Sequence, residues 1–282
     1  MLKQVALFAV LGVFLFLNSI VPPLSAAQEG CSRSLLEERA DSYVNALRKG
    51  DPGLMLLSPN AGYVENRMQT PLNSGIWKEP LTIDFYRTFL DVEACEAFSE
   101  IISAKSEHPY VIGTRLKVSG GSIVEIEALV TDQDDWLFNA DTYLKYSPAE
   151  NWGELAVAQR SDRETLISAA NAYFDVFRDS STANKVPWNI PCARLEGGTY
   201  TNPDNDPRAS CTGGPPLEGS VEITNRRFVV DLNKGVVVGL ANFGDSNGWP
   251  DSHTFRLENG KVRYVHTLTV CPQGCVLPSR GE

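Results

Sequence analysis

Hydrophobic residues recur at helical spacing in two distant segments of the chain, residues 35–47 and 166–177. In both segments the apolar positions fall three or four residues apart, which predicts an amphipathic helix with one buried face. A short polar loop, a proline and a β-like segment follow each helix, at residues 59–66 and 191–197. Further β-rich segments, separated by turn signals, come next in both halves of the chain.

Because the two series align in order, we predict a tandem duplication, with a first module at residues 28–160 and a second at residues 161–282. The alignment pairs three sets of positions: Tyr43 with Tyr173, Glu65 with Glu196, and Tyr143 with His253. Helices followed by a run of strands predict the α+β fold class, in which the N-terminal helices of each module pack on one face of a curved antiparallel sheet.

The first 27 residues have the pattern of a secretory signal peptide. Lys3 precedes an apolar core at residues 5–17, and small residues at 25–27 provide a cleavage site. The alternative is a membrane anchor that stays in place. An asparagine and two prolines argue against it, because they interrupt the apolar run before it reaches the about 20 residues that span a bilayer. We therefore expect a secreted, extracellular protein.

The chain has six cysteines, an even number that can form three disulfides in an oxidising compartment. No Cys-x-x-Cys pair or Cys-His cluster is present, so the spacing does not indicate a zinc site. Connectivity does not follow from spacing, and we predict the pairs nearest in sequence: Cys31–Cys95, Cys192–Cys211 and Cys271–Cys275.

The composition is acidic, with 25 lysines and arginines against 35 aspartates and glutamates and a formal net charge of −10. This balance argues against nucleic acids and anionic membranes as partners. The chain lacks a Gly-x-Ser-x-Gly elbow, a His-Glu-x-x-His helix, a dinucleotide-binding glycine motif and a phosphate loop. We therefore predict no cofactor and no metal, and leave the oligomeric state open.

Two of the three histidines lie in a predicted β-hairpin near the C-terminus. Asn259 and Gly260 are the preferred dipeptide of a two-residue type I′ turn, which would place His253 directly opposite His266. On this register both rings share one apolar face with Phe255, Tyr264 and other apolar residues. His108, before a proline at a strand entry, is predicted to be a surface or turn residue.

A histidine pair of this kind has three interpretations. Burial and mutual repulsion would keep one ring neutral, so it could act as a general base, with Asp251 or Glu196 holding its tautomer. The pair could instead be a structural polar patch inside the sheet, because structural networks also shift pKa values. A third possibility is a metal site formed by two histidines and one carboxylate.

Several segments resemble a family of secreted fungal proteins with no assigned activity, and the resemblance covers nearly the whole mature chain. The segments that carry it are Ala40-Asp41-x-Tyr43, Tyr63-Val64-Glu65-Asn66, Gly113-Thr114-Arg115-Leu116-Lys117-Val118, Pro191 to Gly198, and Asp251-Ser252-His253 with Val265-His266-Thr267. The element order also resembles the nuclear transport factor 2-like (SnoaL-like) cone. This resemblance implies two tandem cone-shaped modules, each with a deep apolar pocket between helices and bent sheet.

Some cone-fold enzymes, including dehydratases and polyketide cyclases, use histidine with aspartate, and often tyrosine, to move protons without a cofactor. By analogy we expect a cofactor-independent lyase or isomerase acting on a small organic molecule in the C-terminal pocket. The alternatives are a binding protein without turnover and an interaction protein. The expected catalytic residues are His253, His266, Asp251 and Glu196, and the expected substrate-binding residues are Tyr264, Phe255, Arg194, Tyr200 and Trp249.

Overall fold

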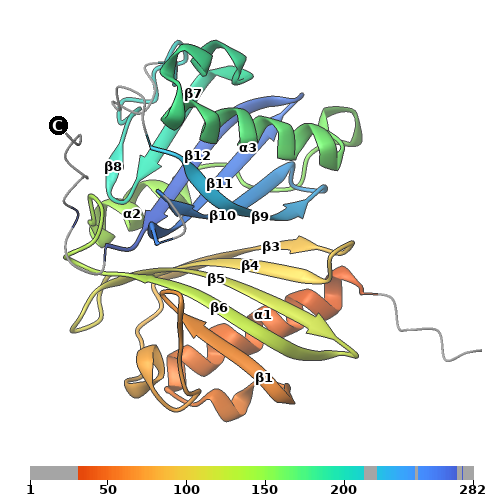
Figure 1. The fold of residues 1–282 in the computed structure, drawn as a ribbon, viewed down its shortest axis with the longest axis vertical. Helices are drawn as coiled ribbons and strands as arrows, with labels where there is room; N and C mark the ends of the chain where they lie inside the picture. The colour runs from red at the N-terminus through yellow and green to blue at the C-terminus, as the bar shows by residue number, and fades with distance from the viewer. Residues whose placement is uncertain (1–30, 213–220, 245–246, 272–274, 276–282) are drawn as a thin grey trace, which may run out of the picture. The chain divides into compact units, whose positions relative to one another are not determined.

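The computed structural model describes residues 31–212, 221–244, 247–271 and 275, and in them two series of elements follow one another (Figure 1). The first series is α1 (Arg33–Lys49), η1 (Pro52–Leu54), β1 (Leu57–Glu65), β2 (Met68–Gln69), η2 (Gly75–Lys78), β3 (Phe85–Asp91), β4 (Glu96–Ser103), β5 (Tyr110–Ser119) and β6 (Ser122–Thr131). The connection holds α2 (Ala140–Tyr146), η3 (Ser147–Ala149) and η4 (Val157–Gln159). The second series is α3 (Arg163–Arg178), η5 (Ser180–Lys185), β7 (Trp188–Glu196), β8 (Thr199–Tyr200), β9 (Ile223–Asp231), β10 (Val236–Phe243), β11 (Trp249–Glu258) and β12 (Lys261–Thr269).

Each series forms a six-stranded sheet with the same strand order, β2-β1-β6-β5-β4-β3 in the first and β8-β7-β12-β11-β10-β9 in the second. The predicted α+β class with two tandem modules is confirmed. The sheets are mixed rather than antiparallel throughout, because β1 pairs parallel with β6, and β7 with β12. Periodicity alone does not show which strands become neighbours, so this pairing was not predictable. The predicted boundary at residues 160 and 161 stays a prediction.

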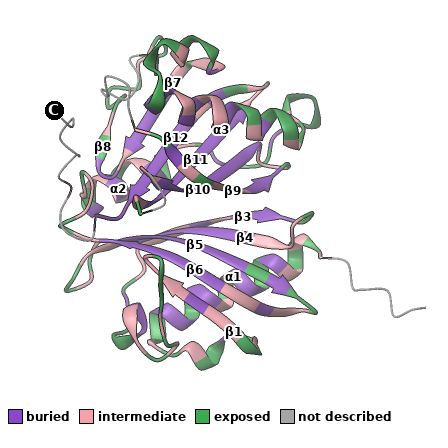
Figure 2. Cartoon of the chain, viewed as in Figure 1, coloured by how far each residue is buried: buried purple, intermediate pink, exposed green. Residues whose placement is uncertain are grey.

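One long helix packs on each sheet, and its sequence explains where it begins and what it buries (Figures 1 and 2). The Ser32 side chain accepts a hydrogen bond from Leu35 N at the start of α1, and Asp162 does the same for Thr165 N at the start of α3. Tyr43 and Tyr173 are each the eleventh residue of their helix, and both are buried. The predicted equivalence of these two tyrosines agrees with their place in the repeat.

All three predicted disulfides are present: Cys31–Cys95, Cys192–Cys211 and Cys271–Cys275. Each disulfide joins two consecutive cysteines of the chain, with separations of 64, 19 and 4 residues. The predicted signal peptide at residues 1–27 lies outside the described residues. Among the residues that are described, no helix combines the length and apolar character needed to cross a membrane.

The C-terminal hairpin has the predicted turn but a different register. Asn259 and Gly260 both have positive φ, 52° and 73°, as a type I′ turn requires, and Glu258 pairs with Lys261. The register then shifts, because Leu257 pairs with Val262 but Arg256 pairs with Tyr264. Arg263 is therefore the extra residue of a β-bulge.

This bulge separates the two histidines. His253 pairs with Thr267, and His266 pairs with Thr254. Because successive side chains of a strand point to opposite faces, a shift of one residue places His253 and His266 on opposite faces of the sheet. The prediction of a cross-strand histidine pair was wrong.

The alignment of Tyr143 with His253 was also wrong, because Tyr143 lies in α2. The strand registers identify the true counterpart of His253. Glu196 pairs with Thr267, which pairs with His253; in the first sheet Glu65 pairs with Ala128, which pairs with Thr114. Thr114 therefore occupies the position of His253, while Glu65 and Glu196 are equivalent as predicted.

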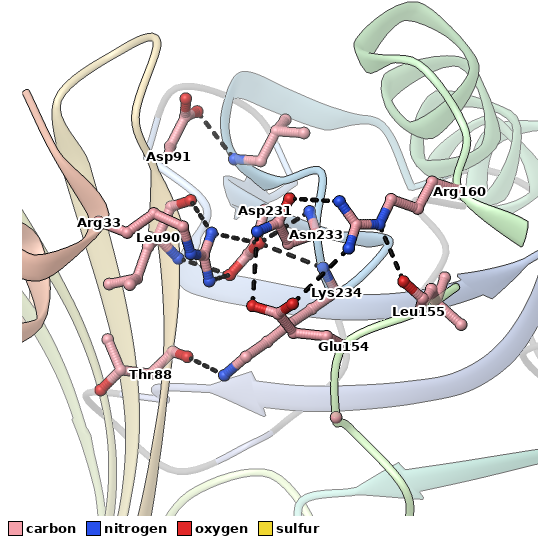
Figure 3. Close-up of polar contacts among 12 residues, drawn as sticks. Arg33, Thr88, Leu90, Asp91, Glu154, Leu155, Arg160, Asp231, Asn233 and Lys234 are labelled. Carbon is pink, nitrogen blue, oxygen red and sulfur yellow. Dashed lines mark hydrogen bonds and ion pairs between the residues drawn. The ribbon is translucent and has the colours of Figure 1, made fainter. Parts of the chain in front are cut away.

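Two reciprocal ion pairs join the modules, and Figure 3 shows the first of them. The first residue of α1, Arg33, makes two hydrogen bonds of 2.8 and 3.0 Å to Asp231 at the end of β9. The first residue of α3, Arg163, makes two of 2.9 Å to Asp91 at the end of β3. Both carboxylates are buried, and each also accepts a backbone N–H from the other module. The contact thus has the two-fold character of a symmetric dimer within one chain.

Removing one of these buried carboxylate charges should weaken the folded state measurably. We expect Asp91→Asn to lower the free energy of unfolding by about 1–3 kcal/mol, because bonds to Arg163 and Val230 N lose their charge assistance. Denaturant unfolding measures this change. Glu93→Gln is the control, since that exposed carboxylate lies 3.9 Å from Arg163 and its loss should cost less than about 0.5 kcal/mol. Equal effects of the two variants would contradict this role for Asp91.

Candidate functional site

Side chains from three neighbouring strands meet on the α3-facing side of the second sheet. Glu196 on β7, Thr267 on β12 and His253 on β11 are paired in one row. Residues directly opposite one another project to the same face, so the three side chains share it. The ring of His253 contacts the rings of three α3 residues, Tyr173, Phe174 and Phe177. The row therefore lies between sheet and helix, where the resemblance to cone-shaped folds placed a pocket.

His253 and Asp251 form a buried pair in this site. Nδ1 of His253 lies 2.8 Å from Oδ2 of Asp251, and Thr269 Oγ1 donates to Oδ1 at 2.7 Å. The carboxylate can only accept, so it favours the tautomer with the proton on Nδ1 and leaves the lone pair on Nε2. Within the described part of the chain, His253 makes no hydrogen bond through Nε2. This arrangement suits a general base.

Beside this pair, four buried side-chain atoms lack a hydrogen-bond partner among the described residues: Arg194 Nε and Nη1, Glu196 Oε1 and Thr267 Oγ1. Arg194 Nη1 and Glu196 Oε1 lie 3.1 Å apart as an ion pair, but without hydrogen-bond alignment. Arg194 is only 9% exposed. An unsatisfied buried polar group costs about 1–3 kcal/mol, so such a concentration of them needs an explanation. A bound polar molecule would provide one.

Tyr173 of α3 is part of the same electrostatic site. Burial raises the pKa of Tyr173 well above its usual value, and the Glu196 carboxylate raises it further, while Arg194 acts in the opposite direction. The phenol therefore stays protonated at neutral pH and can donate a hydrogen bond.

The equivalent place in the first module is occupied by its own chain. Glu65 accepts hydrogen bonds from Ile76 N of η2, at 2.8 Å, and from the Tyr63 hydroxyl. Thr114, the counterpart of His253, bonds the Tyr43 hydroxyl at 2.9 Å. Trp77 of η2 packs against both tyrosines with ring centroids 5.4 and 5.8 Å away. Trp77 Nε1 makes no hydrogen bond among the described residues. The Glu65 carboxylate and the hydroxyls of Tyr43, Tyr63 and Thr114 are all hydrogen-bonded. The second module is therefore the better candidate for a ligand site.

His266 lies on the other face of the second sheet, in a buried ionic cluster. Nδ1 lies 2.8 Å from Glu100 of β4, and Nε2 lies 2.6 Å from Glu150 after η3. Glu100 also accepts hydrogen bonds from Tyr143 and Ser147 and pairs with Arg87, and Trp152 donates to Glu150. Both ring nitrogens are bonded and the residue is 1% exposed, so this histidine joins the first module, the connection and β12.

The protonation of this cluster follows from its charges. Burial by itself lowers the pKa of His266, but the charges and hydrogen bonds of Glu100 and Glu150 outweigh burial and raise it to about 9. Burial by itself raises the pKa of Glu100, but the charge and hydrogen bond of His266, then Arg87, lower it to about 2. At neutral pH His266 is a cation between two carboxylates, and it is not available as a base.

The structure separates the other expected site residues. Phe255 stacks on His253 with centroids 6.0 Å apart and lies in the site. Tyr264 stacks on Trp152 on the face of His266, and Tyr200 stacks on Tyr146 of α2. Trp249 stacks on Phe243 at the start of β11. His108 is exposed in the turn between β4 and β5, as predicted.

Two site residues, Tyr173 and Thr267, were absent from the predicted set. The repeat alignment had already marked Tyr173, and its helix face points to the sheet, so it was within reach of sequence reasoning. Thr267 depends on the bulge at Arg263, which no sequence signal indicated. The alternative of a metal bound by both histidines and a carboxylate is wrong, because the rings face opposite sides. No group of three or more potential metal ligands occurs among the described residues.

Comparisons with known proteins find a domain match within the second half of the chain. Residues 159–269 match the model of a domain of unknown function (DUF8021). Among solved structures, the chain is similar to a protein of unknown function with a cystatin-like fold from Methylobium petroleophilum PM1, at 19% identity and a TM-score of 0.30. That match covers 37% of this chain and 80% of the other. A search of curated proteins finds no match. The matched family region runs from just before α3 to the end of β12, and includes Arg194, His253 and the rest of the candidate site.

Proposed function

We propose that the second module binds a small organic molecule between α3 and the sheet and transfers protons on it without a cofactor, as a lyase or isomerase. The observation that carries this proposal is the His253–Asp251 pair beside buried side-chain atoms of Arg194, Glu196 and Thr267 that make no hydrogen bond among the described residues. A histidine whose tautomer is held by a carboxylate can act as the base for proton abstraction next to a carbonyl, and the Arg194 guanidinium can donate to the carbonyl oxygen.

The roles in this reaction follow from position. His253 Nε2 takes a proton from the carbon beside the carbonyl, and the electron pair of that C–H bond forms a C–C double bond as the carbonyl pair moves to oxygen. Arg194 then faces the negative oxygen and stabilises it. The imidazolium then returns the proton in one of two ways. In an elimination, the enolate re-forms the carbonyl and its C–C pair forms a double bond to the next carbon, whose hydroxyl takes the proton and leaves as water. In an isomerisation of a hydroxycarbonyl compound, the proton goes to the former carbonyl carbon while the hydroxyl proton passes to the other oxygen, so that the second carbon becomes the carbonyl. His266 takes no part, because both of its ring nitrogens are bonded to the carboxylates of Glu100 and Glu150.

Solvent deuterium exchange tests the catalytic role. Phenacyl alcohol, whose methylene lies beside a ketone, serves as the probe, and proton NMR in heavy water follows the loss of its methylene signal. We expect the protein to accelerate exchange and His253→Gln to lose the acceleration by about 100-fold or more. His108→Gln, an exposed histidine, is the control and should keep it. Undiminished exchange in His253→Gln would contradict the role of His253, and binding of the probe without exchange would favour a binding protein.

We also propose that the protein is secreted. Three disulfides within about 250 residues are typical of an oxidising compartment. Intact-mass measurement of the protein recovered from culture medium tests this: loss of residues 1–27 is expected, and their retention would contradict signal cleavage.

A further inference from the structure

We propose that the molecule bound in the second module is a neutral hydroxycarbonyl compound, whose carbonyl oxygen accepts from Arg194 and whose hydroxyl donates to Glu196. This inference rests on the proposed function for the location of the site. It adds the chemical class of the ligand, which follows from the unsatisfied groups and their charges.

Three residues of the site have atoms without a hydrogen-bond partner among the described residues. Arg194 Nε and Nη1 are donors only, so they need an acceptor. Glu196 Oε1 is an acceptor only, so it needs a donor, and Thr267 Oγ1 can serve as either. A ligand that offers an acceptor and a donor close together satisfies all three residues. A lone carbonyl leaves Glu196 unsatisfied, and a simple alcohol leaves at least one donor of Arg194 unsatisfied.

Charge also restricts the ligand. The site contains two carboxylates, Glu196 and Asp251, and one guanidinium, Arg194. Both carboxylates already have partners, since Arg194 faces Glu196 and His253 faces Asp251. An anionic ligand would add a third negative group to a buried site that holds one guanidinium, and charges are poorly screened there. A cation would leave the two open nitrogens of Arg194 facing a like charge. A neutral ligand is therefore favoured.

The strand spacing and the aromatic residues around His253 restrict the ligand further. Glu196 and His253 are separated by one strand, β12, so their backbones are about 10 Å apart at the usual strand spacing. A ligand that contacts Arg194 and Glu196 on one side and His253 on the other must therefore span about this distance across Thr267. Tyr173, Phe174 and Phe255 surround His253 and provide an apolar wall. The carbon beside the carbonyl can thus lie near Nε2 while the polar groups of the ligand lie at β7.

A matched set of four aromatic probes tests the ligand class with the full secreted chain. Phenacyl alcohol carries both groups, acetophenone only the carbonyl, styrene glycol only hydroxyls, and mandelate a hydroxyl with a carboxylate. Calorimetry or ligand-observed NMR measures their dissociation constants. We expect phenacyl alcohol to bind at least about tenfold more tightly than each of the other three, because each of them leaves a charged group without its partner or adds an anion.

Variants then assign the contacts. Arg194→Gln should weaken phenacyl alcohol and acetophenone by about tenfold and leave styrene glycol nearly unchanged, whereas Glu196→Gln should weaken the hydroxyl-bearing probes. Arg178→Gln, at an exposed position of α3, is the matched control. If either single variant unfolds because its partner is left charged, the double variant Arg194→Gln with Glu196→Gln, which removes both charges, replaces it and should remove the preference for phenacyl alcohol.

The outcomes separate this inference from the proposed function. Preferred binding of mandelate, or equal binding of all four probes, would overturn the neutral hydroxycarbonyl class even if proton exchange is observed. Preferred binding of phenacyl alcohol without exchange would support the ligand class and overturn the catalytic role. A preference that survives in the double variant would place the ligand elsewhere and overturn the inference.

Discussion

Replacing His266 with glutamine should lower the free energy of unfolding by about 3–5 kcal/mol, because it leaves buried carboxylates without their cation. Glu100 would keep Arg87, Tyr143 and Ser147, whereas Glu150 would be left with the neutral donors Trp152 and Tyr200. Denaturant unfolding at pH 6 measures the loss. His108→Gln is the control, since that exposed ring lies 3.8 Å from Asp132 and its replacement should cost less than about 0.5 kcal/mol.

The pH dependence of the same cluster has a definite sign. The pKa of His266 is raised from 6.5 to about 9, so its stabilisation is complete below about pH 6.5 and is lost as the pH rises through about 9. The pKa of Glu100 is lowered from 4.5 to about 2, so its part is complete above about pH 4.5 and is lost as the pH falls through about 2. The wild-type chain should therefore lose stability between pH 7 and 9. An equal loss in His266→Gln would show that another group causes it.

Removing the Cys31–Cys95 disulfide should be comparably costly. It closes a segment of 64 residues, and the chain-entropy estimate for a loop of this length is about 4 kcal/mol. Both cysteines also pack against the core of the first module. Unfolding of the Cys31→Ser, Cys95→Ser double variant under oxidising conditions measures the effect. The matched control is Cys271→Ser with Cys275→Ser, whose separation of 4 residues predicts about 2 kcal/mol. A smaller loss for the long loop than for the short one would contradict this account.

The sequence was informative where local chemistry decides the structure. The apolar stripe of each long helix and the Asn259-Gly260 turn were recognisable because each depends on residues close together in the sequence. The tandem repeat was recognisable because two series of such signals recur in the same order. The parallel pairing of β1 with β6 and of β7 with β12 depends on contacts between strands distant in sequence, which local patterns do not encode.

The candidate site, too, could be predicted only in part from the sequence. His253, Asp251, Arg194 and Glu196 were expected together, and they share one side of the second sheet. His266 was misplaced because a single residue, Arg263, bulges out of the ladder, and one unpaired residue reverses every side chain beyond it. Nor could its partners be predicted, since Glu100 and Glu150 lie 166 and 116 residues away in the sequence.

The central claim is that the two buried histidines have different roles, His253 in ligand chemistry and His266 in joining the modules. The most direct test is a long-range proton–nitrogen NMR spectrum of the imidazole rings, recorded at neutral pH with and without phenacyl alcohol. The chain has only three histidines, and the His253→Gln and His108→Gln variants assign the signals. The account predicts that the probe shifts the ring nitrogens of His253 and leaves those of His266 in place. A shift confined to His266, or no shift at His253 under saturating probe, would contradict it.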